Sequence, residues 1–450
     1  MKLLILDGTI ANSPVGQYTE QVGLAHGADV TRFALGEIQI APCLGDFECW
    51  TKTPGRCRTH DAAQKITQAI HDADLVTFLT PVVFGGYASA LKKLVDRLIP
   101  LTDAFFHEQA GMTRHQRRYE RYPAMLFIGL TDQADEEAQS LFTELAGGNA
   151  INLQTPWFSA LLVSLRDNHW HQRIEIAVRN GLTGGPGEAL PLPEKDALAR
   201  ACTPDFFAPE SPAPRTATIL IGSARPKGSS TSESLANELS AGLEQAGIRT
   251  TLVHAISFVK DGILAEKALA TILAGELLVV ATPLYVDALP ALVTRGLEQL
   301  AEKCRDGKYP LRSVVGLLNC GFPEASHNRS AVNILRIFSH ECGLVWAGGL
   351  AMGAGEIIHG QPLANIRLVA RAQIRALRRA ASDLAGGQGI SQTASDDMAR
   401  PLLPAFLFRW LAPFKWIRMG RQHGIGWRQL HARPLNDPAG STQPPSCSRT

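Results

Sequence analysis

The stretches TPVVFGGYASALKKLVDR at residues 80–97 and TPLYVDALPALVTRGLEQ at residues 282–299 share one arrangement. Each begins with Thr-Pro directly after a short apolar run, and each continues through a turn into an apolar-periodic helix. Apolar runs that alternate with helical patterns are typical of a parallel sheet wrapped by helices. The two stretches therefore predict that one α/β unit occurs twice in tandem.

Each half of the chain contains apolar runs in the same order, and we interpret these runs as strands. They predict strands at 2–6, 28–35, 74–80, 123–130 and 156–163, and again at 217–222, 248–255, 277–282, 312–319 and 344–351. The predicted fold class is α/β, with two doubly wound five-stranded parallel sheets of order 2-1-3-4-5 and a C-terminal helical tail.

The proline-rich segment 183–215 is a poor candidate for helix or sheet core, because proline removes a backbone donor and fixes φ. We therefore place one domain at 1–182, a linker at 183–215 and a second domain at 216–384. Residues 385–450 are expected to form a polar linker, a basic aromatic tail and a disordered end.

The composition is that of an ordinary globular protein: 450 residues, 45% hydrophobic and 19% charged, with a formal net charge of +2. This charge gives no case for a nucleic-acid partner. Eight cysteines at uneven spacing do not indicate a disulfide scaffold. Neither a secretory leader nor an apolar run long enough to span a membrane is visible, so we expect a soluble cytoplasmic protein.

A loop rich in Gly, Ser and Thr follows the first strand of the second half. Small residues let the backbone approach an anion, and hydroxyls together with helix N-terminal amides bind phosphate oxygens. The plain alternative is a Ser-rich turn with a helix N-cap. The candidate phosphate-binding residues here are Ser223, Arg225, Ser229, Ser230, Thr231 and Ser232.

Two further loops meet this one by topology, because ligands of doubly wound sheets bind beyond the carboxyl ends of the strands, where the strand order reverses. The loop after the third strand contributes an apolar and aromatic wall, and the loop after the fourth strand completes the site. Their candidate residues are Pro283, Leu284, Tyr285 and Val286, and Asn319, Cys320, Gly321 and Phe322.

The sequence GSARPKGSSTSESLA (222–236), followed by the TPLY loop, resembles the flavodoxin-like superfamily of NAD(P)H-dependent FMN reductases and quinone reductases. The first half resembles the multimeric flavodoxin-like and iron–sulfur-flavoprotein-like oxidoreductases. The residues that carry this second resemblance are PCLGDFECWTKTPGRC (42–57), the stretch 80–97 and TRHQRRYERYP (113–123). The C-terminal tail also looks like one that some single-domain relatives carry.

The resemblance implies that each Thr-Pro loop packs against the isoalloxazine ring of FMN; the alternative is a plain strand-to-helix turn. In the second domain the matching residues are those of the TPLY loop, and in the first they are Pro81, Val82, Val83, Phe84 and Gly85. It further implies that the charged residues of the first-domain helix are structural rather than catalytic. They are Lys92, Asp96 and Arg97, which Thr294, Glu298 and Gln299 replace in the second domain.

The two halves differ in the residues that they offer for binding the phosphate of a flavin. The loop DGTIANSPVGQY (7–18) of the first half offers Thr9, Asn12 and Ser13, but it begins with Asp7, which would repel a phosphate. We expect FMN first in the second domain, and in the first domain only as a further possibility. In relatives the flavin lies near a dimer interface, so the fused halves are expected to form a pseudo-dimer in which one half specialises as a lid or docking surface.

The insertion that carries Cys43, Cys49 and Cys57 has Asp46 where iron–sulfur relatives have another cysteine. Because clusters prefer four thiolates, we expect no metal here, with a cluster or a zinc site of these four residues as the less favoured alternatives. Trp50, in the same insertion, is a candidate to cover one face of a flavin pocket.

The resemblance also places His115, Arg118 and Tyr119 near the nicotinamide or substrate side, with a solvated surface as the alternative. His327 is expected to be structural. From 400 to 435 the tail contains seven Arg or Lys residues and no Asp or Glu, interleaved with Phe and Trp. We expect this tail to dock on its own domains or on a neighbouring subunit, with contact to a membrane surface as the alternative.

Together these features predict a flavin-dependent oxidoreductase that passes electrons from NAD(P)H through FMN to a quinone, a nitroaromatic compound, a flavin or a protein acceptor. No catalytic side chain is expected, because the flavin carries the chemistry. Two alternatives remain: an FMN electron carrier without a nicotinamide site, and a flavin-free scaffold or sensor. The choice of NADH or NADPH, the acceptor and any homo-oligomer stay open.

Overall fold

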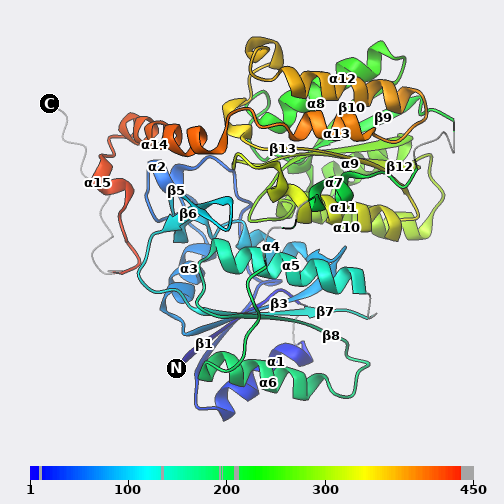
Figure 1. The fold of residues 1–450 in the computed structure, drawn as a ribbon. Helices are drawn as coiled ribbons and strands as arrows, with labels where there is room; N and C mark the ends of the chain where they lie inside the picture. The colour runs from blue at the N-terminus through cyan, green and yellow to red at the C-terminus, as the bar shows by residue number, and fades with distance from the viewer. Residues whose placement is uncertain (10–12, 133–135, 192–193, 195, 207–211, 437–450) are drawn as a thin grey trace.

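The computed structural model describes residues 1–9, 13–132, 136–191, 194, 196–206 and 212–436, which form two parallel sheets (Figure 1). The first sheet has the order β2-β1-β3-β7-β8, with β4 antiparallel to the end of β3. The second has the order β10-β9-β11-β12-β13. Both correspond to 2-1-3-4-5, so the predicted tandem of flavodoxin-like, doubly wound sheets is confirmed.

The strands alternate with helices throughout both halves. The strands are β1 (Lys2–Asp7), β2 (Asp29–Ala34), β3 (Leu75–Val83), β4 (Gly86–Tyr87), β5 (Thr102–Gln109), β6 (Met112–Arg117), β7 (Ala124–Leu130), β8 (Phe158–Val163), β9 (Thr216–Ile221), β10 (Arg249–His254), β11 (Leu277–Pro283), β12 (Ser313–Asn319) and β13 (Val345–Met352). The α-helices are α1 (Pro14–Ala25), α2 (Glu48–Thr51), α3 (Ala62–Asp72), α4 (Ser89–Val95), α5 (Glu136–Asn152), α6 (Trp170–Thr183), α7 (Ala197–Cys202), α8 (Thr231–Gln245), α9 (Ile263–Ala274), α10 (Ala291–Asp306), α11 (Arg329–Glu341), α12 (Arg371–Ala385), α13 (Gln392–Ala399), α14 (Ala405–Gln422) and α15 (Trp427–Leu430).

The molecule is built in layers (Figure 1). Helices α1 and α6 cover the outer face of the first sheet, and α8, α12 and α13 cover the outer face of the second. Between the sheets, α4 and α5 of the first half face α10 and α11 of the second. The core there is one continuous hydrophobic cluster, to which Phe84 and Leu141 contribute from the first half and Ile337 and Phe338 from the second.

The two halves cap each other's helices. Asp96, just after α4, accepts a hydrogen bond at 2.8 Å from the backbone N–H of Ala291, the first residue of α10. Glu298, on α10, accepts one at 2.8 Å from the backbone N–H of Ser89, the first residue of α4, and one at 2.5 Å from its hydroxyl. The first amides of a helix have no partner within the helix, so each carboxylate satisfies one of them and lies favourably in the helix dipole.

The contacts between the halves explain why the first Thr-Pro stretch contains Lys92 and Arg97 where the second contains Thr294 and Gln299. Lys92 pairs with Asp96 in the buried interface and donates to the carbonyl oxygen of Tyr285 at 2.7 Å. Arg97 pairs with Asp61 at 3.0 Å and donates to the carbonyl oxygen of Ala41 at 2.7 Å, which fixes the cysteine-containing insertion. The second domain has no such insertion, and Gln299 replaces the arginine there.

Three segments differ from the sequence-based expectations. No strand was expected between 80 and 123, but residues 102–117 form the antiparallel hairpin of β5 and β6. The proline-rich segment contains the helix α7, whose Ala201 and Cys202 are buried against the second domain. The polar stretch after α12 forms α13, whose Met398 is buried. None of the described helices has the length and apolarity needed to cross a membrane.

The buried Lys92–Asp96 pair leads to a stability prediction. Burial raises the pKa of the Asp96 carboxyl, while Lys92, the amide of Ala291 and Arg97 oppose that rise. Lys92→Met leaves the carboxylate buried without its main partner, so we expect a loss of about 3–5 kcal/mol in the free energy of unfolding. Urea unfolding followed by tryptophan fluorescence and circular dichroism measures this loss.

Lys93→Met is the matched control, because Lys93 is only half-buried and donates to one carbonyl oxygen, that of Ile38. We expect it to cost about 1 kcal/mol. Equal losses for the two variants would contradict the structural role assigned to the Lys92–Asp96 pair.

Candidate functional site

A small cradle of hydroxyl groups lies where β9 ends and α8 begins. Gly222 follows β9, and its backbone N–H donates to the carbonyl oxygen of Ala281 at 2.7 Å. A Cβ atom at this glycine would lie 2.4 Å from the Thr282 hydroxyl, so the close approach of the two strand ends requires glycine. Ser230 is the N-cap of α8, and its Oγ accepts from the N–H of Glu233 at 3.2 Å.

Three buried serines, Ser223, Ser230 and Ser232, line this cradle of about 60 Å³. Each accepts a hydrogen bond, and the Ser232 oxygen accepts from Asn319 Nδ2 at 2.8 Å. Their own protons have no acceptor among the described residues. The first amides of α8 lie at the same place, so the cradle presents donors and the positive end of a helix dipole. This donor set fits a phosphate group.

Two other predicted residues of the loop face elsewhere. Ser229 donates to the carbonyl oxygen of Pro226 at 2.5 Å and lies outside the cradle. Thr231 lines the cradle, but its hydroxyl donates to the carbonyl oxygen of Gly355 at 2.7 Å.

Arg225 lies at the rim of the cradle but is engaged by the first domain. Its Nε donates to the carbonyl oxygen of Gly45 at 3.0 Å, and its guanidinium group lies 5.4 Å from the ring centroid of Phe47. It also pairs with Glu356 at 3.3 Å, and Lys415 of the tail pairs with the same carboxylate at 2.9 Å. Burial alone would raise the pKa of Glu356, but His359 and these two cations lower it to about 2. Two cations thus surround one carboxylate, which leaves this rim with an excess of positive charge.

An apolar cavity of about 320 Å³ adjoins the cradle and shares several lining residues with it. Three separate parts of the chain build its wall. The first domain contributes Cys43, Gly45, Phe47, Trp50, Asp96, Ile99, Thr102, Phe106, His115, Asn152 and Leu153. The second domain contributes Leu284, Tyr285, Val286, Asp287, Cys320, Gly321, Phe322, Glu356 and Ile357. The tail contributes Leu403, Phe408, Leu411, Ala412, Lys415 and Trp416.

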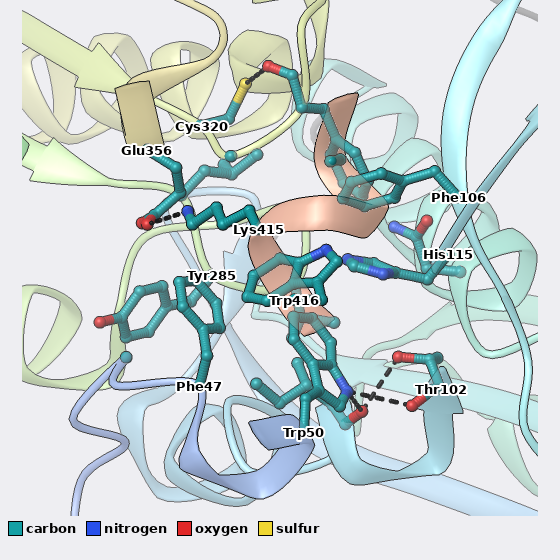
Figure 2. A pocket seen from close by; sticks show the side chains of 18 of the residues that line it. Phe47, Trp50, Thr102, Phe106, His115, Tyr285, Cys320, Glu356, Lys415 and Trp416 are labelled. Carbon is teal, nitrogen blue, oxygen red and sulfur yellow. Dashed lines mark hydrogen bonds and ion pairs between the residues drawn. The ribbon is translucent and has the colours of Figure 1, made fainter. Parts of the chain in front are cut away.

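Aromatic rings from the insertion and the tail line this cavity, and Figure 2 shows Phe47 beside Tyr285 and Trp416 close to Trp50. The rings of Phe47 and Trp50 are stacked with centroids 5.3 Å apart, and Trp416 of α14 meets both edge-on at 5.4 and 5.5 Å. Trp50 Nε1 donates to the carbonyl oxygens of Thr102 and Ile99 at 3.0 and 3.1 Å. Flat apolar walls of this kind exclude water and suit a planar ring system.

The Tyr285 loop, which also lines the cavity, is held in an unusual conformation. Val286 and Asp287 both have positive φ, at 44° and 60°, in a tight turn that closes the Tyr285–Ala288 bridge. A β-branched residue at positive φ is strained, and such strain persists only where the surroundings enforce it. Asn149 of the first domain donates to the carbonyl oxygen of Val286 at 3.2 Å and to Asp287 Oδ2 at 3.1 Å. Asn152 donates to the same carboxylate oxygen at 2.5 Å.

The remaining predicted loop residues of the second domain also come together here. Pro283 lines the cradle. Cys320 and Gly321 line both the cradle and the cavity, and Phe322 lines only the cavity. Burial raises the pKa of the Cys320 thiol to about 12, with the Glu324 charge adding to the rise. A protonated thiol is a weak nucleophile, so this cysteine serves here as a wall residue.

The equivalent place in the first domain is filled by the protein's own carboxylate. Asp7 lies beside the first turn of α1, where a Cβ atom on Gly16 would approach its Oδ2 to 2.2 Å. It pairs with Arg32 at 2.5 Å and accepts from the backbone N–H and hydroxyl of Thr9 at 2.9 and 2.5 Å. Ser13 is the N-cap of α1, and its hydroxyl accepts from the Gly16 N–H at 3.4 Å. The predicted Asn12 lies outside the described residues.

The first-domain Thr-Pro loop lines an open pocket of a different character. Pro81, Val82, Val83 and Phe84 line it together with the acidic side chains of Glu37, Glu298, Glu302 and Glu341, and with Arg305. Phe84 is buried and packs edge-on against Phe338 at 5.1 Å, and a Cβ atom on Gly85 would meet Leu141 at 2.8 Å. The apolar side of this loop therefore belongs to the interface between the halves, and the surrounding charges do not suit a phosphate.

The cysteine-containing insertion does not assemble a metal centre in the part of the chain that the structure describes. Cys43, Cys49 and Cys57 have free thiols, and Asp46 is engaged by Arg58 at 3.4 Å. Burial raises the pKa of the Cys43 thiol to about 12 and that of the Cys49 thiol well above its usual range. These three cysteines and Asp46 line one small pocket, and a metal bound there would have to displace the protons of the buried thiols.

The structure separates the residues of segment 113–123. His115 lines the cavity, and its Nδ1 lies 2.9 Å from the carbonyl oxygen of Asp103. Arg118 is buried elsewhere and donates to the carbonyl oxygens of Leu430 and Ala432, which fixes the chain after α14. Tyr119 packs against His71 at 4.7 Å, outside the cavity. His327 is buried behind Phe322, whose ring it stacks on at 4.3 Å.

Sequence reasoning missed most of the wall residues that come from the first domain and from the tail. Among them, only Trp50 and His115 were predicted to lie near a flavin or a substrate, whereas Cys43 and Asp96 were assigned other roles. Nothing in the sequence indicated that the hairpin β5–β6 lines the cavity, because Phe106 looks like any other strand residue there. The interleaved aromatic residues of 400–435 were the one visible sign that the tail has a buried face, and Phe408 and Trp416 form it.

Comparison with known proteins matches residues 1–160 to the family described as NADPH-dependent FMN reductase. An iron–sulfur flavoprotein of Methanocaldococcus jannaschii is 33% identical over 79 residues, which cover 18% of this chain and 40% of that protein. The chain therefore spans two fifths of the length of this curated relative. The family match falls on the half of the chain in which Asp7 fills the phosphate position.

Solved structures of similar fold include an azoreductase from Bacillus anthracis, with 14% identity and a TM-score of 0.29 over 38% of this chain and 98% of that one. An NAD(P)H:quinone oxidoreductase from Methanothermobacter marburgensis has 14% identity and a TM-score of 0.31 over 41% and 98%. An FMN-dependent NADH-azoreductase from Bacillus anthracis, solved with FMN, has 14% identity and a TM-score of 0.31 over 40% and 98%.

The cavity leads to a prediction about pH. Burial lowers the pKa of His115 to about 3, against 6.5 for the ordinary side chain, although the hydrogen bond with Asp103 opposes this. Because the folded protein resists protonation of this ring, its stabilising contribution is complete above about pH 6.5 and is lost progressively toward pH 3. The loss at about pH 5 amounts to as much as ~2 kcal/mol.

We therefore expect His115→Phe to flatten the fall in stability between about pH 7.5 and pH 5, as measured by urea unfolding at each pH. Part of the fall remains, because burial lowers the pKa of His327 as well. His60→Phe, at an exposed position, is the control. An unchanged pH dependence in His115→Phe would contradict the assignment of a buried neutral ring.

Proposed function

We propose that this chain is an FMN-dependent oxidoreductase whose single flavin site lies in the second domain. The observation that carries the proposal is the continuity of the hydroxyl cradle at the N-terminus of α8 with the aromatic cavity. The cradle fits a phosphate and the cavity fits a planar tricyclic ring, which are the two ends of FMN. The family match of residues 1–160 supports the assignment to flavin chemistry.

Different residues would bind the phosphate and the ring of FMN. Ser223, Ser230 and Ser232 donate to phosphate oxygens, and the first turn of α8 adds its dipole. Leu284, Tyr285 and Val286 form the wall on one side of the ring. The aromatic side chains of the insertion and of the tail form the wall on the other side and exclude water.

Flavin chemistry, when FMN is bound, is the acceptance of a hydride and its later release as electrons. NAD(P)H is the proposed reductant, and a quinone, nitroaromatic compound, flavin or protein is the proposed acceptor. The chain's own contribution is to position the reacting molecules and to exclude water from the cavity. His115 suits this task, since its lowered pKa keeps the ring uncharged near pH 7.

The first half acts as the lid of this site in our proposal, and the contact between the halves corresponds to the dimer contact of single-domain relatives. Its support is the reciprocal capping between Asp96 and Ala291 and between Glu298 and Ser89. We accordingly expect one FMN per chain. Quantification of flavin by absorbance after reconstitution measures this number, and two FMN per chain would contradict the assignment of Asp7 as an internal anion.

The cradle is tested by Ser230→Ala, which removes a hydroxyl donor to the phosphate. A hydrogen bond to a charged group contributes about 1.5–3 kcal/mol, so we expect FMN to bind about 10- to 100-fold more weakly. Riboflavin lacks the phosphate, and its affinity should change little. Fluorescence titration of both flavins measures the ratio of affinities.

Ser13→Ala is the matched control, because both serines are N-caps of long helices that accept from a backbone N–H in the first turn. Both variants should lose about 1 kcal/mol of stability. Only Ser230→Ala should lose its preference for FMN over riboflavin. A protein that binds neither flavin would refute the proposed function, and equal effects of the two variants would refute the cradle.

An anaerobic mixing experiment separates an oxidoreductase from an electron carrier. The FMN-loaded protein is mixed with NADPH or with NADH, and the flavin absorbance near 450 nm is followed. We expect rapid bleaching with one of the two nucleotides. A flavin that only dithionite reduces would favour the carrier.

A further inference from the structure

Helix α14 has two apolar faces, and the described part of the chain covers one of them. Phe408, Ala412 and Trp416 are buried and face the cavity and the second domain. Phe406, Trp410 and Phe414 are 69%, 65% and 60% exposed. Residues four apart lie on one side of a helix, so these three rings form a stripe. A stripe of exposed aromatic rings is unusual on a protein surface and indicates a binding face.

The unpaired charges on this side of α14 and α15 are positive. Arg418 and Arg421 follow Phe414 on the same helix, and Arg428 lies on α15 next to the exposed Trp427. These three arginines are exposed and have no acidic partner among the described residues. The segment from 400 to 435 contains no Asp or Glu, so nothing in it repels an anionic surface.

The other cations of the tail are already engaged and hold the helix in place. Arg409 pairs with Glu108 of the hairpin, and Lys415 pairs with Glu356. The two sides of α14 therefore differ in charge as well as in burial. Arg409 and Lys415 are paired with acidic residues, whereas Arg418 and Arg421 are exposed. Figure 1 shows α14 and α15 at the outer edge of the molecule.

We propose that the exposed side of α14 and α15 docks on the surface of an anionic lipid bilayer. Aromatic rings settle at the boundary of headgroups and acyl chains, and arginines bind anionic headgroups, which is the combination that this face presents. A protein partner that matches it would have to supply acidic groups around an apolar groove, and a second copy of this face brings arginines against arginines. The charge pattern therefore favours a lipid surface.

Docking in this orientation has a consequence for the cavity. Leu411 lies beside the aromatic stripe, is 40% exposed and also lines the cavity. The rim of the cavity therefore lies next to the docked surface. Membrane docking itself is independent of flavin binding, so it is tested without reference to activity.

The test is cosedimentation of the full-length protein with sucrose-loaded vesicles. The vesicles contain phosphatidylcholine with about 30% phosphatidylglycerol, or phosphatidylcholine alone. We expect binding to the anionic vesicles that weakens with added salt, and at least tenfold weaker binding to the neutral ones. No binding to the anionic vesicles at low salt would overturn the proposal.

Variants of the two parts of the face sharpen the result. Trp410→Ser combined with Phe414→Ser should weaken binding at least tenfold, and Arg418→Gln combined with Arg421→Gln should weaken binding to anionic vesicles by a similar factor. None of these residues lines the cavity. The control is Ile263→Ser with Leu264→Ser, which removes two apolar side chains that are 87% and 70% exposed on α9 and should leave binding unchanged.

Self-association is the competing explanation for an exposed aromatic face. Light scattering after gel filtration measures the mass of the wild-type and variant proteins without lipid. An oligomer that Trp410→Ser with Phe414→Ser converts to monomer, together with unchanged vesicle binding by that variant, would assign the face to a second copy and overturn the proposal. Equal circular dichroism spectra of the variants show that a loss of binding is not a loss of folding.

Discussion

The buried ion pair between Lys92 and Asp96 is the contact on which the composite site depends. It lies in the interface between the halves, and each of its two residues forms a hydrogen bond with the second domain. Lys92 donates to the carbonyl oxygen of Tyr285, and Asp96 accepts from the first amide of α10. Burying two charges is costly, and such a pair is retained where its geometry specifies one arrangement. Here it specifies how the Tyr285 loop stands relative to the first domain.

That loop could not hold its conformation alone. Val286 and Asp287 at positive φ each cost about 1–3 kcal/mol, and glycine would remove most of that cost. The first-domain loop has the same turn with Phe84 and Gly85, where one of the two positions is glycine. The second-domain loop is instead enforced from outside by Asn149 and Asn152. Strain in one half is thus compensated by hydrogen bonds from the other, which explains why the halves form one structural unit.

The fold and the cradle follow from local sequence, whereas the lid does not. Strands and their order were predictable because buried parallel strands read as apolar runs between helical patterns, and the Thr-Pro stretches mark the same strand end twice. Ser223, Ser230 and Ser232 were predictable because the chemistry of an N-terminal helix turn is carried by consecutive residues. The orientation of the Arg225 side chain could not be predicted, because its partners Gly45 and Glu356 lie far away in the sequence. The helices α7 and α13 were missed for the same reason, because packing on the second domain overrides their polar and proline-rich surroundings.

The divergence of the two phosphate positions has a simple electrostatic cause. A glycine follows each first strand: a Cβ atom on Gly8 would lie 2.8 Å from Leu91 of α4, and one on Gly222 would lie 2.4 Å from Thr282. Each strand is then followed by a helix with a serine N-cap. In the first half, Asp7 occupies the positive end of α1 and is neutralised by Arg32, so a second anion there would meet a carboxylate. In the second half, Ile221 stands at the end of the strand and leaves the place open. One carboxylate therefore converts an anion site into a structural contact and frees the first half to serve as the wall of the other half's cavity.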